Sequence, residues 1–278
     1  MFSVEKIKKR LGIQILFDFD NVIDAVDFGL DNKLNVIELN LNNVNFSEQI
    51  KSRAGRKEIS QYIHRHKMNL QFHALEGLSL FIPDKDAQKF VVKSLAKTLD
   101  YASEIRVKRV TVQLGIDMSF SLTSQKKYTH EVYPDYFTNH IYDALASLRQ
   151  IASRNTFLCI ENVGGFRYPF VLNIIQQFLG GKLGLTLDIG HINRFKGIDK
   201  EREYNFFYNN RKYIKNCHIH DNNGEWDQHN IIGEGNIDFK PYFEFLADSD
   251  TNYIFEVRPK ESAIECVKRF DQLFSSHR

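Results

Sequence analysis

The feature that most constrains this fold is an alternation, repeated eight times, of a short apolar segment and a helical pattern. The apolar segments are mainly continuous, which is typical of strands that are buried on both faces of a parallel sheet. We predict strands at residues 13–19, 34–41, 68–75, 107–114, 156–163, 183–189, 214–219 and 253–257. We predict helices at residues 21–30, 56–67, 86–105, 136–154, 168–179, 199–213, 240–247 and 261–275.

The number of these units favours a closed barrel. Eight strand–helix units in 278 residues fit a (β/α)8 barrel better than an open doubly wound sheet. No glycine-rich phosphate-binding fingerprint follows the first strand, as an open nucleotide-binding sheet would require. Because the composition shows no break and no linker, we expect a single domain over residues 1–278. The sequence therefore predicts an α/β fold with one TIM barrel.

The net charge, the cysteines and the N-terminal residues indicate which partners and which cellular compartment to expect. A net charge of +2 gives no overall electrostatic signature of nucleic-acid binding. The three cysteines, Cys159, Cys217 and Cys266, are odd in number and widely spaced, which suits a reducing compartment. The first residues contain neither a signal sequence nor a membrane span. We therefore expect a cytoplasmic protein with no membrane segment.

Polar side chains stand at the C-terminal ends of six predicted strands. They are His73, Gln113, Glu161, Asp188, His218 and Glu256. In a barrel these ends form one face, which is where active sites are built. Charged groups in apolar strands are costly unless they are paired or bound to a metal. One such residue can be a structural ion pair, but three carboxylates and two histidines on one rim favour a metal site.

The stretch 216–239 adds further donors to this rim, including Asp227 and His229. Side chains alternate along a strand, so His218 and His220 point the same way. Carboxylate and imidazole groups at such spacing are the ligands that divalent metals take. The alternative is a polar loop whose histidines cluster without binding anything.

Five motifs together resemble the xylose isomerase-like TIM-barrel superfamily, and the resemblance covers nearly the whole chain. They are Glu161-Asn162, DIGH at 188–191, HIHDN from His218, DQHNIIGEGNIDF at 227–239 and the FEVRP that contains Glu256. The superfamily includes sugar isomerases, sugar epimerases and AP endonucleases of the endonuclease IV type. The resemblance implies a core divalent metal held by Glu161, Asp188, His218 and Glu256. Such a mixed carboxylate and imidazole set permits Mn, Mg, Co or Zn. It also implies that a second metal or the substrate is bound by some of His73, Gln113, His191, Asp227 and His229.

The sequence departs from the superfamily patterns at three places. Where the multi-zinc endonuclease pattern has a histidine after strand four, this chain has Gln113, and glutamine is a poor zinc ligand. No aromatic residue follows His73 closely, so a base-stacking wedge is not evident there. Sugar epimerases carry an arginine soon after the strand-seven histidine. An Asn-Asn-Gly turn at 222–224 occupies that place here, which leaves Arg258 as the candidate substrate-binding arginine.

The leading hypothesis is a metal-dependent isomerase or epimerase acting on a small sugar or sugar phosphate. Glu161 and Glu256 would move the proton at carbon beside a metal-polarised oxygen, while Asn162 and His220 would orient the metal ligands. One alternative is an endonuclease IV-like zinc phosphodiesterase acting on abasic DNA. Another is a barrel that binds a metal and a sugar-like ligand without turnover.

The expected partner is therefore a sugar-like small molecule. A nucleic-acid partner is disfavoured, because the long connection 115–134 carries only Lys126 and Lys127 against Asp117 and Glu131. The sequence leaves a homo-oligomer open.

Overall fold

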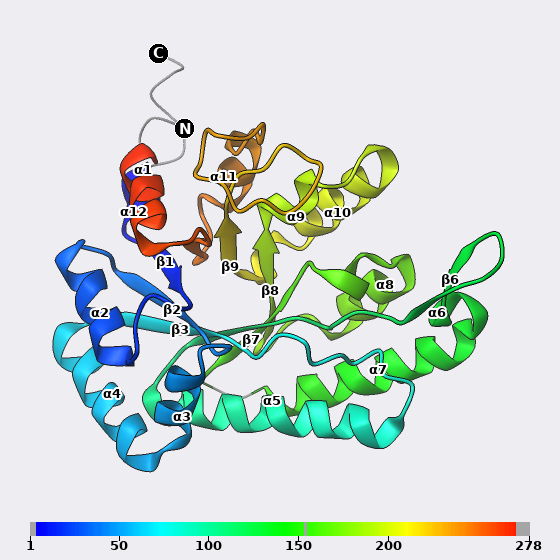
Figure 1. Ribbon diagram of the computed structural model, residues 1–278, viewed down its shortest axis with the longest axis horizontal. Helices are drawn as coiled ribbons and strands as arrows, with labels where there is room; N and C mark the ends of the chain where they lie inside the picture. Colours follow the sequence, from blue (N-terminus) through cyan, green and yellow to red (C-terminus); the bar gives the residue numbers. More distant parts are fainter. Residues whose placement is uncertain (1–3, 153–154, 271–278) are drawn as a thin grey trace.

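The structure is a computed structural model that describes residues 4–152 and 155–270. Eight parallel strands close into a barrel with helices around it, which confirms the predicted (β/α)8 fold (Figure 1). The barrel strands are β1 (Leu11–Ile15), β2 (Val36–Asn40), β3 (Asn69–His73), β4 (Arg109–Val112), β7 (Phe157–Glu161), β8 (Leu183–Asp188), β9 (Ile214–Ile219) and β10 (Asn252–Phe255). Around the barrel they follow the order β1-β10-β9-β8-β7-β4-β3-β2, so that β7, β8, β9 and β10 are neighbours.

The helices cover the outside of this barrel with amphipathic faces. The longer ones are α2 (Val22–Asp31), α3 (Val44–Lys51), α4 (Arg53–His66), α5 (Lys85–Ile105), α7 (Pro134–Ile151), α8 (Pro169–Phe178), α10 (Gly197–Asn209), α11 (Lys240–Leu246) and α12 (Lys260–Arg269). Short turns of helix are α1 (Val4–Lys8), α6 (Thr129–Val132), α9 (Ile189–Asn193), η1 (Gly164–Arg167) and η2 (Arg211–Tyr213). Among the described residues, no helix has the length and apolar character needed to cross a membrane.

The main differences from the predictions concern the first strand and helix α3. The first strand is Leu11–Ile15 and not 13–19, and Phe17, which we placed in it, is 77% exposed. Helix α3 was not predicted, because only Phe46 and Ile50 are buried in an otherwise polar segment. The side chain of Asn43 starts α3 by accepting a hydrogen bond from the Phe46 N–H. The last residues of the predicted helices 136–154 and 261–275 lie outside the described residues.

The connection after β4, expected to be irregular, contains a hairpin of β5 (Ser119–Ser121) and β6 (Lys126–Tyr128), followed by α6. In Figure 1 it lies at the right edge of the molecule. The buried carboxylate of Asp117 holds the hairpin base, because it accepts hydrogen bonds from the Thr129 hydroxyl and from the His130 N–H. Nδ1 of His130 lies 2.6 Å from the same carboxylate.

The interior of the barrel is unusually polar at its middle level. TIM barrels are normally filled by branched apolar side chains. Here Gln71 Nε2 donates to Asn216 Oδ1 at 2.8 Å, and Asn252 Nδ2 donates to Gln71 Oε1 at 2.8 Å. The hydroxyls of Thr111 and Thr186 are also 2.8 Å apart. These buried groups satisfy one another and form the floor beneath the C-terminal mouth of the barrel.

Candidate metal centre

The structure places the six strand-end residues at the C-terminal mouth, as their positions in the chain require. His73, Glu161 and Asp188 are the last residues of β3, β7 and β8, and His218 is the last but one of β9. Gln113 directly follows β4, and Glu256 directly follows β10. His191 lies on α9, whereas Asp227 and His229 lie in the long loop after β9.

Three carboxylates surround one nitrogen of His218. Its Nδ1 lies 2.6 Å from Glu161 Oε1, 2.8 Å from Glu256 Oε2 and 3.9 Å from Asp188 Oδ2. All four residues are buried, and one potential ligand atom from each lies within 4.8 Å of the others. Buried carboxylates in such number require compensating positive charge, from protons or from a metal ion.

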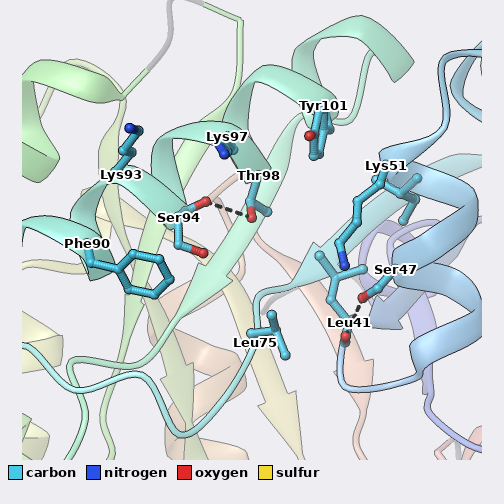
Figure 2. A pocket seen from close by; sticks show the side chains of 11 residues that line it. Leu41, Ser47, Lys51, Leu75, Phe90, Lys93, Ser94, Lys97, Thr98 and Tyr101 are labelled. Carbon is cyan, nitrogen blue, oxygen red and sulfur yellow. Dashed lines mark hydrogen bonds between the residues drawn. The ribbon is translucent and has the colours of Figure 1, made fainter. Parts of the chain in front are cut away.

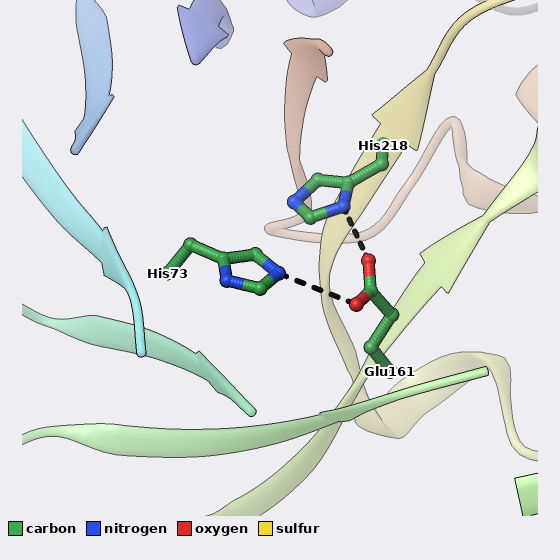
Figure 3. Close-up of side chains that lie close together, drawn as sticks. All are labelled: His73, Glu161 and His218. Atoms are coloured by element: carbon green, nitrogen blue, oxygen red, sulfur yellow. Dashed lines mark hydrogen bonds and ion pairs between the residues drawn. The ribbon is translucent and has the colours of Figure 1, made fainter. Parts of the chain in front are cut away.

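His73 and Gln113 contact the other oxygen of the Glu161 carboxylate. Figure 3 shows Glu161 contacting both imidazoles, one with each oxygen, with His73 Nε2 at 3.3 Å from its Oε2 and His218 Nδ1 on its Oε1. The amide of Gln113 also donates to Glu161 Oε2, at 2.9 Å. Gln113 therefore belongs to the cluster of His73, Glu161 and His218 as a hydrogen-bond donor.

A second cluster forms around Asp227. Its Oδ2 lies 3.0 Å from His191 Nε2 and 3.4 Å from His229 Nε2. His220 lies between the two clusters, since its Nε2 is 3.2 Å from Asp188 Oδ1 and 3.7 Å from Asp227 Oδ1. The His220 ring also stacks on the His229 ring, with 3.9 Å between the ring centroids.

Asn162 fixes the backbone of Asp188. Its side chain donates to the Asp188 carbonyl at 2.9 Å and accepts from the Asp188 N–H at 2.6 Å. Asp188 in turn caps α9, since Oδ1 accepts from the His191 N–H at 2.8 Å. The backbone positions of Asp188 and His191 are thus set together.

Two buried carboxylates near these clusters were not predicted from the sequence. Glu203, on α10, accepts from Asn162 Nδ2 at 2.7 Å, and burial raises its pKa to about 7. Glu38 lies inside the barrel on β2, with Oε1 at 2.9 Å from His218 Nε2. The signal available for Glu38 was a charge in the apolar strand VIELN, but it stands in mid-strand and not at the strand end. For Glu203 the weakly amphipathic α10 gave no signal.

The close contacts between buried carboxylates and imidazoles shift the pKa values of both in the chain without an ion. Burial alone would raise the pKa of Glu161 and Glu256, but the nearby His218 holds the pKa of both carboxylates well below the usual range. Burial alone would lower the pKa of His73, His191 and His229, but adjacent carboxylates raise it to about 9, 10 and 9. Protons therefore balance the acidic charge when no ion does so.

The residues present fit divalent ions. Among the described residues, His191 Nδ1, His220 Nδ1 and Asp227 Oδ1 are buried and have no hydrogen-bond partner, which is rare for buried polar atoms. Mixed carboxylate and imidazole donors suit Zn, Mn, Co or Mg. The core donor set is Glu161, Asp188, His218 and Glu256. Three further sets are His73, Glu161 and His218; Asp188, His191 and His220; and His220, Asp227 and His229.

A cavity of about 390 Å³ opens above these clusters, within the size range of small-molecule sites. Leu16, Phe17 and Asn42 line it together with residues of both clusters. Arg258 is the one arginine or lysine among its described lining residues. Its Nη2 contacts Gln14 Oε1 and lies 3.0 Å from Glu256 Oε1, which holds the guanidinium beside the core.

Another cavity, of about 400 Å³, lies between α3 and α5 and shares no described lining residue with the first (Figure 2). Lys51, Lys93 and Lys97 stand around an apolar floor that includes Leu41 and Leu75. No carboxylate, imidazole or thiol is among its described lining residues, so it offers a divalent ion no ligand.

Comparison with known proteins agrees with the fold. The family described as xylose isomerase-like TIM barrel matches residues 24–270. Two uncharacterized proteins of Methanocaldococcus jannaschii are 29% identical over 173 residues and 40% identical over 105 residues. These matches cover 56% and 37% of this chain and 58% and 39% of the relatives, so the chain spans about half the length of the curated relatives it matches.

Solved structures match over a greater length. A D-tagatose 3-epimerase-like protein superposes with a TM-score of 0.77 at 20% identity, covering 95% of this chain and 97% of the other. The IOLI protein with a binding zinc atom gives 0.71 at 16% identity, covering 96% and 99%. Endonuclease IV from Thermus thermophilus gives 0.63 at 16% identity, covering 95% and 98%. At these identities the likeness concerns the fold.

Proposed function

Because the chain belongs to the xylose isomerase-like TIM barrel family, we propose that it is a divalent-metal-dependent isomerase or epimerase of a small sugar or sugar phosphate. The observation that carries the proposal is the convergence of Glu161, Asp188, His218 and Glu256 on one buried point. The cavity above that point has the volume for a small substrate. Two sugar epimerases or epimerase-like proteins among the structural neighbours support the same reaction class.

The core residues would hold one ion, of Mn, Mg, Co or Zn. When bound, that ion supplies a Lewis acid that polarises a carbonyl or hydroxyl oxygen of the sugar. Arg258 is the proposed substrate-binding cation, because it lines the cavity next to the core.

Glu161 and Glu256 are the proposed proton-transfer groups. Each points one carboxylate oxygen at His218 Nδ1 and keeps the other on a donor, Gln113 for Glu161 and Arg258 for Glu256. Without an ion, His218 holds the pKa of both carboxylates well below the usual range, so both are ionised. One carboxylate would take the proton from the substrate carbon beside the polarised oxygen, and one would return a proton to complete the reaction.

Isotope exchange tests this proposal. The protein is loaded with Mn²⁺ or Zn²⁺ and incubated in deuterated water with a panel of ketoses and their phosphates. Deuterium should enter a carbon of one substrate with the wild type and with Glu244→Gln, an exposed control. It should not enter with Glu256→Gln, which retains an oxygen for the ion but is no longer a base. Exchange by Glu256→Gln at the wild-type rate would remove Glu256 from the mechanism.

The second cluster favours a second candidate, a zinc phosphodiesterase acting on abasic DNA. Several ions held close together can activate water and stabilise a leaving oxygen. His191 and His229, which both face Asp227, would offer a further ion a place. Two observations disfavour this candidate. Gln113 is a poor zinc ligand, and Arg258 is the one arginine or lysine among the described residues that line the cavity, where DNA binding would call for several. Incision of an abasic-site duplex, with no deuterium entering any sugar, would establish this candidate. Metal and sugar binding without either activity would indicate a barrel that does not turn over.

We further propose that the chain is a single domain, because the first barrel strand, β1, pairs with the last, β10, and this pairing closes the barrel. The cytoplasm remains its proposed location, on the three free cysteines.

A further inference from the structure

Glu38 is a fully buried carboxylate in the middle of the barrel. It stands on β2, opposite Gln14 of β1 and Gln71 of β3 in the strand register. Its Oε1 lies 2.9 Å from Nε2 of His218, which comes from β9 across the barrel. The proposed ligand His218 therefore has a carboxylate on each of its two ring nitrogens.

Uncharged amides hold Glu38 in this place. Gln14 Nε2 donates to Oε1 at 2.9 Å, while Gln71 Nε2 and Asn216 Nδ2 donate to Oε2 at 2.7 and 2.9 Å. Amide donors position a carboxylate but do not neutralise it, and a buried carboxylate without a cationic partner is costly. In the described part of the chain, His218 is the imidazole that contacts Glu38. The negative charge of Glu38 is therefore balanced by this ring.

The contact also determines which nitrogen of His218 can bind an ion. Nε2 of His218 also lies 3.0 Å from Asn216 Nδ2, but the two hydrogens of that amide have acceptors in Glu38 Oε2 and Thr111 Oγ1, at 2.9 and 3.1 Å. Because an ionised carboxylate only accepts hydrogen bonds, the proton of the contact between Nε2 and Glu38 belongs to Nε2. The other nitrogen, Nδ1, faces Glu161 and Glu256 at 2.6 and 2.8 Å. Without an ion Nδ1 must also be protonated to contact those oxygens. An ion would replace the proton on Nδ1 and leave the proton on Nε2 in place.

We propose that Glu38 is a positioning residue of the metal site, which fixes the tautomer of His218 with Nδ1 toward the ion and increases the basicity of the ring. This inference rests on the proposed metal-dependent function. A carboxylate behind a metal-binding imidazole typically strengthens metal affinity about 10–100-fold. The polar floor of the barrel thus has a role beyond filling space, because its amides hold the carboxylate that orients His218.

Zinc affinity, measured by competition with a chelator, tests the role of the carboxylate. Glu38→Gln should bind zinc about 10–100-fold more weakly than the wild type. The matched control is the exchange Gln14→Glu with Glu38→Gln, which preserves the charge and the amides of the barrel but moves the carboxylate to β1. We expect this double variant to bind as weakly as Glu38→Gln. Wild-type affinity in either protein would overturn the inference.

A second measurement needs no variant. In zinc-loaded wild-type protein labelled with ¹⁵N-histidine, long-range ¹H–¹⁵N spectra report which ring nitrogen of His218 carries hydrogen. We expect hydrogen on Nε2 and the metal on Nδ1, and the opposite assignment would refute the role of Glu38 even if the variants do not fold. Failure of the wild type to take up any divalent ion would refute the proposed function as well. Normal uptake with unchanged affinity in Glu38→Gln would refute this inference alone.

Discussion

The amide of Gln113 donates a hydrogen bond to the same oxygen of Glu161 that His73 faces, 2.9 Å and 3.3 Å away respectively. Gln113 therefore occupies, as a hydrogen-bond donor, the place beside His73 and Glu161 where a third ligand would let the cluster bind an ion. We expect Gln113→His to bind one more zinc ion per chain than the wild type, because imidazole is a zinc ligand and a glutamine amide is a poor one. Elemental analysis after dialysis measures the content, with the exposed Gln61→His as control. Equal zinc content in both variants would contradict this prediction.

Asn162 should matter for metal binding without touching the ion. Asn162→Ala removes both hydrogen bonds to the Asp188 backbone, so this ligand loses its fixed position. We expect zinc affinity to fall about 10–100-fold but not to vanish, as is usual when a group that orients a ligand is lost. The exposed Asn173→Ala is the control in the same titration. Complete loss of binding would mean that Asn162 does more than orient Asp188.

Glu203 should make stability depend on pH. Burial raises its pKa from 4.5 to about 7, so between these pH values the folded state holds a proton that the unfolded state releases. The wild type therefore loses stability from this group as the pH rises from 4.5 through about 7. Glu203→Gln mimics the protonated acid and avoids this loss.

The free energy of unfolding in urea, measured in chelator at two pH values that bracket this range, reports the effect. Relative to the wild type, Glu203→Gln should gain roughly 3 kcal/mol of stability between the lower and the higher pH, from the shift in pKa. The exposed Glu201→Gln on the same helix should gain none. A gain of the same size in both variants would show that the effect does not come from burial.

Gly190 is required by the ring of His220. A Cβ atom at position 190 would lie 2.0 Å from Cε1 of His220, so Gly190→Ala must displace this imidazole. We expect a loss of about 1–3 kcal/mol in unfolding free energy, as overpacking typically costs, together with weaker zinc binding. The double variant with His220→Ala removes the ring that the methyl group meets. Its stability should exceed that of Gly190→Ala, and a double variant that is less stable would exclude this clash as the cause.

Much of the fold could be predicted, because burial on both strand faces produces continuous apolar segments that the sequence displays directly. LNVIELNL and LGLTLDI are such segments, and β2 and β8 lie within them. Helix α3 and the β5–β6 hairpin could not be predicted in this way. Their residues depend on local caps and on the buried Asp117, not on a long apolar face.

The site was predictable where its residues obey one geometric rule, that polar strand ends of a barrel meet at one mouth. That rule finds Glu161, Asp188 and Glu256, which the structure brings together around His218. It does not find Glu38 or Glu203, because contacts across the barrel or from a covering helix depend on the folded geometry. Whether the clustered residues bind metal remains a prediction.

The four neighbouring strands β7 to β10 carry the whole proposed core, and they come from the second half of the chain. The first half supplies Leu16, Phe17, Asn42, Glu76 and Gln113 to the wall of the cavity. The proposed core ligands thus come from the second half alone, whereas both halves line the cavity, since His191, Asp227 and Arg258 also belong to its wall. Selection for a new substrate could therefore alter the first-half residues of this wall without changing any of the proposed core ligands.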